Sequence, residues 1–251
     1  MMTAPPIGAE PHVTAVMLTT ADRAGMAARA VRCFESQTYP EKDLLVFPTD
    51  HLRGTTTGEL RNLACAEARG DIVAHWDDDD WSHPRRIEEQ VAMLQWRGAD
   101  AGGYREMLFW DTRGPGPGEA WLYSNRDPAY CICASLCYWR AAWERHPFVA
   151  RMIGEAGNAT ESDPRSWLAE LRTLGTTSFI WSVGRIAGSL SRDASASTGW
   201  REWNRNSYHE LRMIAAIHGR NTSDSYSPDR MRSREWRRVP EWDDYCSGIL
   251  R

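Results

Sequence analysis

The sequence predicts an α/β fold with a Rossmann-like, mostly parallel central sheet that carries helices on both faces. Three short apolar segments, residues 13–18, 43–47 and 71–76, each precede a segment with the periodicity of a helix. This alternation is typical of parallel sheets, in which helices form the crossover connections. Polar residues follow each apolar segment, and ligands of such sheets bind beyond the carboxyl ends of the strands. We therefore expect one ligand site at that edge of the sheet.

Helix signals account for the connections between these strands. Residues 22–35 place apolar side chains on one face, and Pro40 closes this segment because proline cannot continue a helix. The second helix is predicted over residues 59–69, with Gly70 at its C-terminal cap. The third helix is predicted over residues 84–96 and begins with a proline in its first turn.

The second half of the chain is less regular. Residues 104–110 and 120–123 flank a Gly-Pro-Gly-Pro-Gly stretch, which predicts a hairpin. Residues 130–138 are apolar enough for a buried strand. Further along we expect helices at 140–145 and 163–174, a polar connection at 189–205, a final strand at 211–217 and a polar, loop-like tail from residue 221. The chain then divides into a flexible lead-in (1–12), one domain (13–223) and a polar tail (224–251).

Composition narrows the class of protein. The chain has 251 residues and a formal net charge of −4, so no global field draws it to nucleic acid or to anionic lipid. It has no apolar run of about 18 residues, which excludes a membrane span, and its first residues lack the apolar core of a signal peptide. Six cysteines at mixed spacings suit a reduced chain better than a disulfide framework. We therefore expect a cytoplasmic protein.

Four consecutive aspartates, Asp77, Asp78, Asp79 and Asp80, follow the third predicted strand. Like charges at contact distance repel and raise one another's pKa, so this cluster is a poor structural choice on its own. It becomes favourable when a divalent cation supplies the opposing charge, and Mg²⁺, Mn²⁺ and Ca²⁺ prefer carboxylate oxygens. The cluster therefore predicts a metal site at the sheet edge.

Several stretches together resemble family-2 glycosyltransferases of the GT-A fold. They are SQTYP at 36–40, RNLA at 61–64, AHWDDDDW at 74–81, SLCY at 135–138 with Trp143, HPF at 146–148 and IHGRNTS at 217–223. The stretch HWDDDDW is typical of a bacterial and phage subgroup of that family. The resemblance covers roughly residues 13–223. It implies a nucleotide-sugar-binding half at 13–103 and an acceptor half at 104–223.

The resemblance implies roles for particular residues. Asp77 and Asp79 match the Asp-X-Asp metal motif, with Asp79 as the direct ligand of Mn²⁺ or Mg²⁺ and Asp77 on the ribose or a metal-bound water. His218 resembles a histidine that helps to hold metal and phosphate. The cation would bridge the two phosphates of a nucleoside-diphosphate-sugar donor and neutralise charge on the leaving group. The other residues implied in nucleotide-sugar binding are Thr19, Ala21, Arg23, Asp50, Arg61 and Asp78.

The sequence departs from the family at two places. The second strand of the family ends in paired acids that hold the base, whereas Pro48 and Thr49 occupy those places here and Asp50 follows. The catalytic base of the family lies in a Glu-Asp pair that opens a helix. We align Asp163 with this base, and Glu161 and Glu155 are the alternatives. Inversion at the sugar carbon needs such a carboxylate to take the proton of the acceptor hydroxyl.

Simpler interpretations remain for several of these residues. The aspartates also fit a solvated loop leading into a helix, and Asp163 also fits a helix cap. Arg61 also fits an ordinary surface arginine, and we interpret His75 as a packed strand residue. Cys131, Cys133 and Cys137 are interpreted as buried small hydrophobes, because their spacing fits no common zinc module. The basic stretch at 230–238 fits a solvated tail better than a phosphate-binding segment.

Three functions are compatible with these residues. The one that the resemblance favours is a metal-dependent, inverting glycosyltransferase that transfers a sugar to a hydroxyl acceptor. A metal-dependent nuclease or phosphoryl-transfer enzyme is the first rival, because clustered aspartates also build two-metal sites. A non-catalytic nucleotide-sugar-binding relative is the second. The sequence does not fix the sugar, the base, the oligomeric state, or whether the acceptor is a glycan, a protein or a modified nucleobase.

Overall fold

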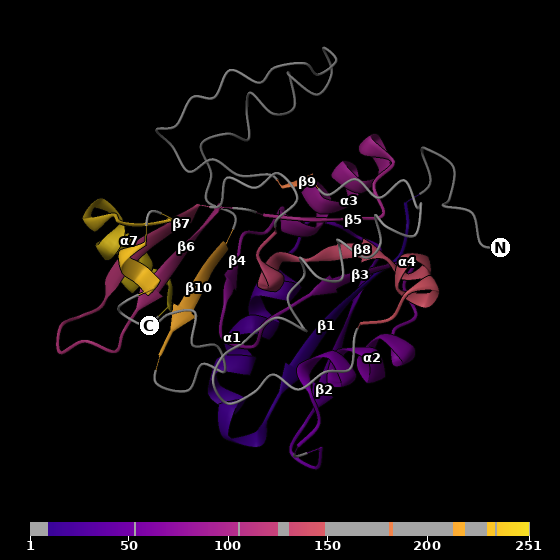
Figure 1. Ribbon diagram of the computed structural model, residues 1–251, viewed down its shortest axis with the longest axis horizontal. Helices are drawn as coiled ribbons and strands as arrows, with labels where there is room; N and C mark the ends of the chain where they lie inside the picture. The colour runs from indigo at the N-terminus through magenta and orange to yellow at the C-terminus, as the bar shows by residue number, and fades with distance from the viewer. Residues whose placement is uncertain are drawn as a thin grey trace.

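The computed structural model describes residues 10–52, 54–104, 106–124, 131–148, 181–182, 213–218, 230–233 and 235–250. Within these residues the strands form two sheets, and Figure 1 shows both. The strand order is β2-β1-β3-β8-β5-β9 in the first sheet and β11-β7-β6-β10-β4 in the second. The helix predicted at 163–174 and the polar connection predicted at 189–205 lie outside the described residues.

The first sheet is the predicted α/β sheet. Its strands are β1 (Val13–Thr19), β2 (Lys42–Pro48), β3 (Ile72–His75), β5 (Ala101–Gly103), β8 (Cys137–Trp139) and β9 (Trp181–Ser182). Strand β1 pairs in parallel with both β2 and β3, which confirms the predicted parallel core. Strand β8 runs antiparallel to both β3 and β5, so the sheet as a whole is mixed.

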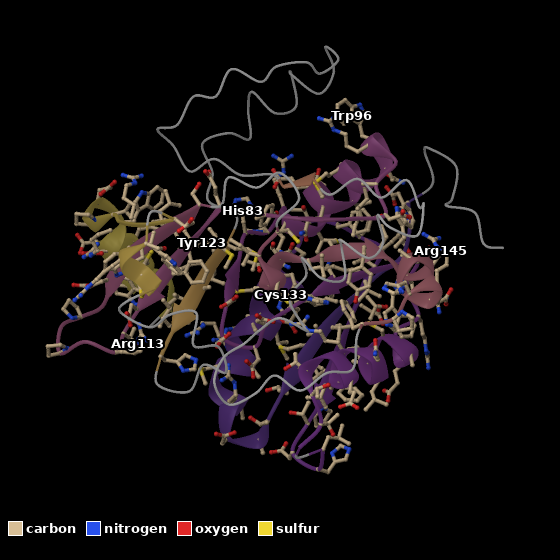
Figure 2. All side chains as sticks on the ribbon, viewed as in Figure 1. His83, Trp96, Arg113, Tyr123, Cys133 and Arg145 are labelled. Carbon is tan, nitrogen blue, oxygen red and sulfur yellow. The ribbon has the colours of Figure 1, made fainter. Side chains whose placement is uncertain are left out.

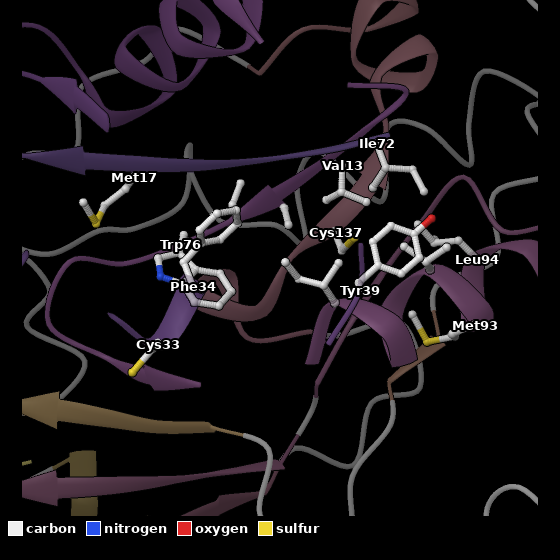
Figure 3. Packing of buried hydrophobic residues seen from close by; sticks show 14 of the residues in the cluster. Val13, Met17, Cys33, Phe34, Tyr39, Ile72, Trp76, Met93, Leu94 and Cys137 are labelled. Atoms are coloured by element: carbon white, nitrogen blue, oxygen red, sulfur yellow. The ribbon is translucent and has the colours of Figure 1, made fainter. Parts of the chain in front are cut away.

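Helices cover both faces of this sheet, as predicted. They are α1 (Ala24–Glu35), which follows a 3-10 turn η1 (Ala21–Arg23), then α2 (Thr57–Glu67), α3 (Arg86–Arg97) and α4 (Arg140–Arg145). Alternate residues of β1 and β3 pack into two separate cores, because successive strand side chains point to opposite faces. Figure 3 shows the core on the α1 and α3 face, where Phe34 and Trp76 meet edge to face with ring centroids 5.7 Å apart.

Helix α2 begins and ends differently from the prediction. It starts at Thr57 because Thr56 and Glu59 form a reciprocal capping box. Its C-terminal cap is Ala68, so the prediction that Gly70 caps the helix is wrong. A Cβ atom at Gly70 would lie 2.5 Å from the Thr14 amide nitrogen and 2.7 Å from the His12 carbonyl oxygen. Glycine is therefore needed here because the backbone of β1 passes too close for a side chain.

The buried strand predicted at 130–138 is wrong over most of its length. The chain instead forms a 3-10 turn, η2 (Cys133–Ser135), and then the short strand β8. Two side chains of α3 bind the carbonyl oxygens of the turn: Arg86 Nη2 donates to Ala134 at 2.9 Å and Gln90 Nε2 donates to Ser135 at 2.5 Å. These carbonyls are therefore satisfied by α3 rather than by a neighbouring strand, which apolar periodicity alone does not reveal.

The second sheet contains the predicted hairpin. Its strands are β4 (Trp81–Ser82), β6 (Glu106–Asp111), β7 (Glu119–Ser124), β10 (Met213–Ile217) and β11 (Trp236–Arg238). Strands β6 and β7 pair antiparallel around the glycine- and proline-rich turn. The strand predicted at 211–217 is confirmed as β10, which lies between β6 and β4 in Figure 1. It is not the final strand, because β11 follows it.

The C-terminal residues are ordered structure rather than the predicted loop-like tail. They form η4 (Arg230–Arg232), β11, η5 (Pro240–Trp242) and α7 (Asp243–Leu250). Strand β11 pairs with β7, and Trp236 lies against the rings of Phe109 and Tyr123. Cys246 and Leu250 of α7 are buried against the back of the second sheet. The prediction was wrong because these apolar residues pack on strands far earlier in the chain, and arginines dominate the composition of residues 230–238. None of the helices in the described part of the chain is long and apolar enough to cross a membrane.

Candidate active site

The three predicted polar strand ends lie together. Thr19, at the end of β1, donates its hydroxyl to Asp78 Oδ2 at 2.7 Å. The amide of Thr49, which follows β2, donates to the Thr19 carbonyl at 2.9 Å. The amide of Ala21 donates to both carboxylate oxygens of Asp50 at 3.1 Å. The ends of β1, β2 and β3 therefore form one polar edge, as expected for neighbouring parallel strands.

Arg23 joins two residues of the acidic loop, our name for residues 77–80. Its Nη2 donates to Asp78 Oδ1 and to Asp79 Oδ2, both at 2.6 Å. Its Nε also lies 3.0 Å and 2.9 Å from the two oxygens of Asp78. The exposed fractions of the three side chains are 15%, 5% and 9% for Arg23, Asp78 and Asp79. This is a mostly buried ion pair with several charge-assisted hydrogen bonds.

The second sheet delivers His218 to the same loop. His218 follows β10, and its Nε2 lies 3.0 Å from Asp79 Oδ2. Burial alone would raise the pKa of Asp79, but the hydrogen bond from His218 and the charge of Arg23 hold that pKa below its ordinary value. Asp79 is therefore an ionised carboxylate that both sheets contact.

Asp80 ties β10 to the acidic loop. Its Oδ1 accepts the amide of Ala216 at 3.1 Å, and its Oδ2 is buried without a hydrogen-bond partner among the described residues. Burial, and then the neighbouring charges of Asp79 and Asp77, raise the pKa of Asp80 well above its ordinary value. A protonated Asp80 would relieve part of the repulsion within the loop.

Asp77 and Arg61 lie at the other end of the acidic loop. Burial raises the pKa of Asp77, the charge of Arg61 lowers it, and Asp79 and Asp78 raise it again. Arg61 Nη1 contacts Nδ1 of His75 on the last residue of β3. His75 is 2% exposed, and burial followed by the charge of Arg61 holds its pKa well below the ordinary value. The interpretation of His75 as a packed strand residue is confirmed, and Arg61 lies near Asp77 as a cation.

Two arginines that the sequence analysis missed support the acidic loop from behind. Arg86 is 1% exposed, and its Nη2 donates to the His75 carbonyl at 2.6 Å. Arg29 of α1 donates through Nη2 to the Asp79 carbonyl at 2.9 Å and through Nη1 to the Leu250 carbonyl at 2.6 Å. Both residues follow the polar spacing of ordinary surface helices, so no signal in the sequence singles them out.

The residues that the structure brings together fit a divalent cation. Ligand atoms at about 2.1 Å from an octahedral cation are about 3.0 Å apart when they occupy adjacent positions. Asp79 Oδ2 and His218 Nε2 lie 3.0 Å apart as hydrogen-bond partners, so a cation that both residues bind would take the place of the proton between them. In the described residues no group of three or more His, Cys, Asp or Glu side chains is placed to hold a metal ion. Magnesium sites commonly use one or two protein ligands and complete the coordination with phosphate and water, so this pair could supply the protein ligands of such a site.

The predicted catalytic acids cannot be placed beside this pair. Asp163, Glu161 and Glu155 lie outside the described residues. Within the described part, the six cysteines have free thiols, and Cys133 lies near the centre of the molecule in Figure 2. The predicted site residues that the structure brings together come from the ends of β1, β2, β3 and β10.

Comparisons with known proteins agree with this architecture. Residues 26–131 match the model of the family described as glycosyl transferase family 2. A search of curated proteins found no match to the chain. Among solved structures, S. aureus TarS 1–349 in complex with UDP-GlcNAc is 12% identical with a TM-score of 0.56, over 95% of this chain and 70% of that one.

Two further structures are similar. The mannosyltransferase PcManGT from Pyrobaculum calidifontis, in complex with GDP-Man and Mn²⁺, is 15% identical with a TM-score of 0.51, over 80% of this chain and 62% of that one. A longer S. aureus TarS is 11% identical with a TM-score of 0.53, and the match covers 82% of this chain but only 37% of TarS. At these identities the likeness shows the fold alone, which is a GT-A-like α/β fold. The matched segment is similar to glycosyl transferase family 2 over fewer than half of the residues of the chain, and these structures share its fold.

Proposed function

We propose that the protein is a metal-dependent, inverting glycosyltransferase that moves a sugar from a nucleoside-diphosphate donor to a hydroxyl acceptor. The observation that carries this proposal is the position of Asp79, an ionised carboxylate in contact with Arg23 of the turn η1 and with His218, which follows β10. Two solved structures with the same fold carry GDP-Man with Mn²⁺ and UDP-GlcNAc, which supports a nucleotide-sugar donor. The HWDDDDW subgroup and the cytoplasmic location, where six free thiols would stay reduced, belong to the proposal as well.

The donor-side roles are assigned from the contacts. Asp79 and His218 would hold Mn²⁺ or Mg²⁺, which supplies Lewis-acid stabilisation of the leaving diphosphate when bound. Asp77, close to Arg61 and without a hydrogen bond among the described residues, would contact the ribose or a metal-bound water. Thr19 orients Asp78 by its 2.7 Å hydrogen bond.

The nucleoside end of the donor would lie beside the turn η1. Asp50 receives the Ala21 amide there, which fixes the exposed carboxylate next to the end of β1. Its second set of lone pairs stays available for a base or a ribose hydroxyl. We therefore assign Asp50, Ala21 and Arg61 to the binding of the nucleotide.

The acceptor-side roles rest on the resemblance described above. Asp163 would accept the proton of the attacking hydroxyl, with Glu161 and Glu155 as the alternatives. Attack from the face opposite the diphosphate would invert the anomeric carbon. The acceptor itself is any molecule that presents a hydroxyl to this carboxylate.

The proposal is tested by donor binding and donor hydrolysis, which need no known acceptor. We expect UDP-GlcNAc or GDP-Man to raise the melting temperature only with Mn²⁺ present, because a ligand that binds the folded state alone stabilises it. Asp79→Asn should abolish this shift and the slow release of free sugar. Asp100→Asn, which breaks a surface ion pair with Arg145, is the matched control and should keep both.

Three results would count against the proposal. Retained Mn²⁺-dependent stabilisation in Asp79→Asn would remove that residue from the metal site. Cleavage of nucleic acid by the wild type, with no effect of either nucleotide-sugar, would favour the metal-dependent nuclease instead. Donor binding without any release of sugar would favour a non-catalytic relative.

A further inference from the structure

Asp79 Oδ2 is shared by two donors. Arg23 Nη2 lies 2.6 Å from it and His218 Nε2 lies 3.0 Å from it. The proposed metal site uses this same oxygen together with His218. Arg23 therefore acts as the counter-ion of Asp79 in this structure.

Arg23 and a divalent cation compete for Asp79. Arginine keeps its charge at every accessible pH, so Arg23 is a permanent cation beside the acidic loop. The charge of Arg23 would repel a second cation at Asp79. The side chains of Arg23, Asp78 and Asp79 are at most 15% exposed, so water screens this repulsion only weakly. The hydrogen bond at 2.6 Å would also have to be given up.

Asp78 and Asp79 hold Arg23 unequally, which allows the contact with Asp79 to be exchanged. Nε and Nη2 of Arg23 make three short contacts with Asp78, and Thr19 donates a hydrogen bond to the same carboxylate. Nη2 also contacts Asp79 Oδ2. A small rotation of the guanidinium can therefore release Asp79 while the pair with Asp78 stays intact.

We propose that Arg23 is an internal counter-cation that makes metal binding at Asp79 conditional on the donor diphosphate. This inference rests on the proposed function. The negative charge of a diphosphate offsets both cations. Its oxygens also accept hydrogen bonds from the N–H groups that Arg23 withdraws from Asp79, and arginine binds phosphate strongly because its guanidinium can form two parallel hydrogen bonds. Metal and nucleotide then favour each other's binding, and the coupling is reciprocal.

The test measures Mn²⁺ affinity by titration calorimetry with and without UDP or GDP. In the wild type we expect Mn²⁺ alone to bind weakly and the better nucleotide to tighten it by about tenfold or more. In Arg23→Gln we expect Mn²⁺ alone to bind about tenfold tighter, because the competing charge is gone. The nucleotide should bind this variant more weakly, and the coupling should fall to about twofold or less.

Two further variants complete the design. Arg145→Gln is the matched control and should leave both affinities unchanged. Arg145 is the last residue of α4, pairs with Asp100 and is labelled on the right of Figure 2. Arg23→Lys keeps the charge but has only a single charged nitrogen, so its coupling should fall between the wild type and Arg23→Gln. If Arg23→Gln does not fold, the coupling measured in Arg23→Lys tests the proposed role of Arg23.

The outcomes separate the two proposals. If the wild type shows coupling and Arg23→Gln binds Mn²⁺ alone no tighter, the inference about Arg23 is wrong and the proposed function stands. Wild-type coupling in Arg23→Lys, when Arg23→Gln is unfolded, also overturns the inference. If the wild type binds neither nucleotide with Mn²⁺, the proposed function fails first.

Discussion

Arg86 joins the segments that flank the acidic loop. Its guanidinium donates to the carbonyl oxygens of His75 and Ala134 at 2.6 and 2.9 Å, to Ser82 Oγ at 2.9 Å and to Gln90 Oε1 at 3.2 Å. It also lies over the Trp76 ring, 4.8 Å from the centroid. These contacts join β3, η2, β4 and α3 immediately behind the acidic loop.

We predict that Arg86→Met lowers the free energy of unfolding by about 3 kcal/mol. Two buried carbonyls lose their donors, at about 1–3 kcal/mol each. The cation–π contact with Trp76 adds about 1 kcal/mol. Removing a buried charge returns part of this loss, since the guanidinium no longer has to be desolvated. Methionine fills most of the same volume, so the cavity contribution stays small.

The assay is urea unfolding of the wild type, Arg86→Met and Arg85→Met. Arg85 is the neighbouring residue and forms an ion pair with Glu88 at 3.2 Å, with side chains 33% and 40% exposed. Such an exposed pair contributes about 0.5 kcal/mol, so the control should unfold close to the wild type. If the two variants differ by less than about 1 kcal/mol, the buried hydrogen bonds of Arg86 do not stabilise the fold as argued.

Two further predictions concern the first sheet. Gly70→Ala should lower the free energy of unfolding by about 2 kcal/mol in thermal or urea unfolding, because the new Cβ would lie 2.5 Å from a backbone nitrogen. The control Gly25→Ala, where no atom lies within 4 Å of the new Cβ, should be neutral or stabilising. Equal effects of the two substitutions would contradict the close approach of the backbone at Gly70. Burial raises the pKa of Tyr39 to about 12, so the folded state keeps a proton that the unfolded chain loses from about pH 10. The stability that this proton contributes is complete below pH ~10 and is lost as pH rises toward 12. Between pH ~9 and ~11 the free energy of unfolding of the wild type should therefore fall by about 1 kcal/mol more than that of Tyr39→Phe. Parallel pH profiles of the two proteins would refute this prediction.

The elements that sequence predicts best are those with clear periodicity. The three parallel strands, the hairpin and β10 follow from apolar alternation and turn residues, and the convergence of Thr19, Asp50 and Asp78 follows from parallel topology. The predicted strand at 130–138 failed because α3 side chains bind its carbonyls. Contacts of that kind join residues distant in sequence and leave no local pattern.

The candidate site divides in the same way. The acidic residues and His218 were found because residue type and resemblance single them out. Arg29 and Arg86 were missed, since a buried arginine has the same letter as a surface one and only the fold reveals its partners. The segment from residue 230 was misjudged because its apolar residues pack on β7, a strand more than 100 positions earlier in the chain.

The contacts that complete the acidic loop join residues far apart in the chain. His218 and Asp79 are separated by 139 positions, and Arg29 and the Leu250 carbonyl by 221. During synthesis the ribosome releases β1, β2 and β3 long before either partner emerges. The carboxylates of the acidic loop are therefore synthesised before His218 and α7 are available to contact them. The complete site can form only when these distant segments pack against the first sheet, which is a late step of folding.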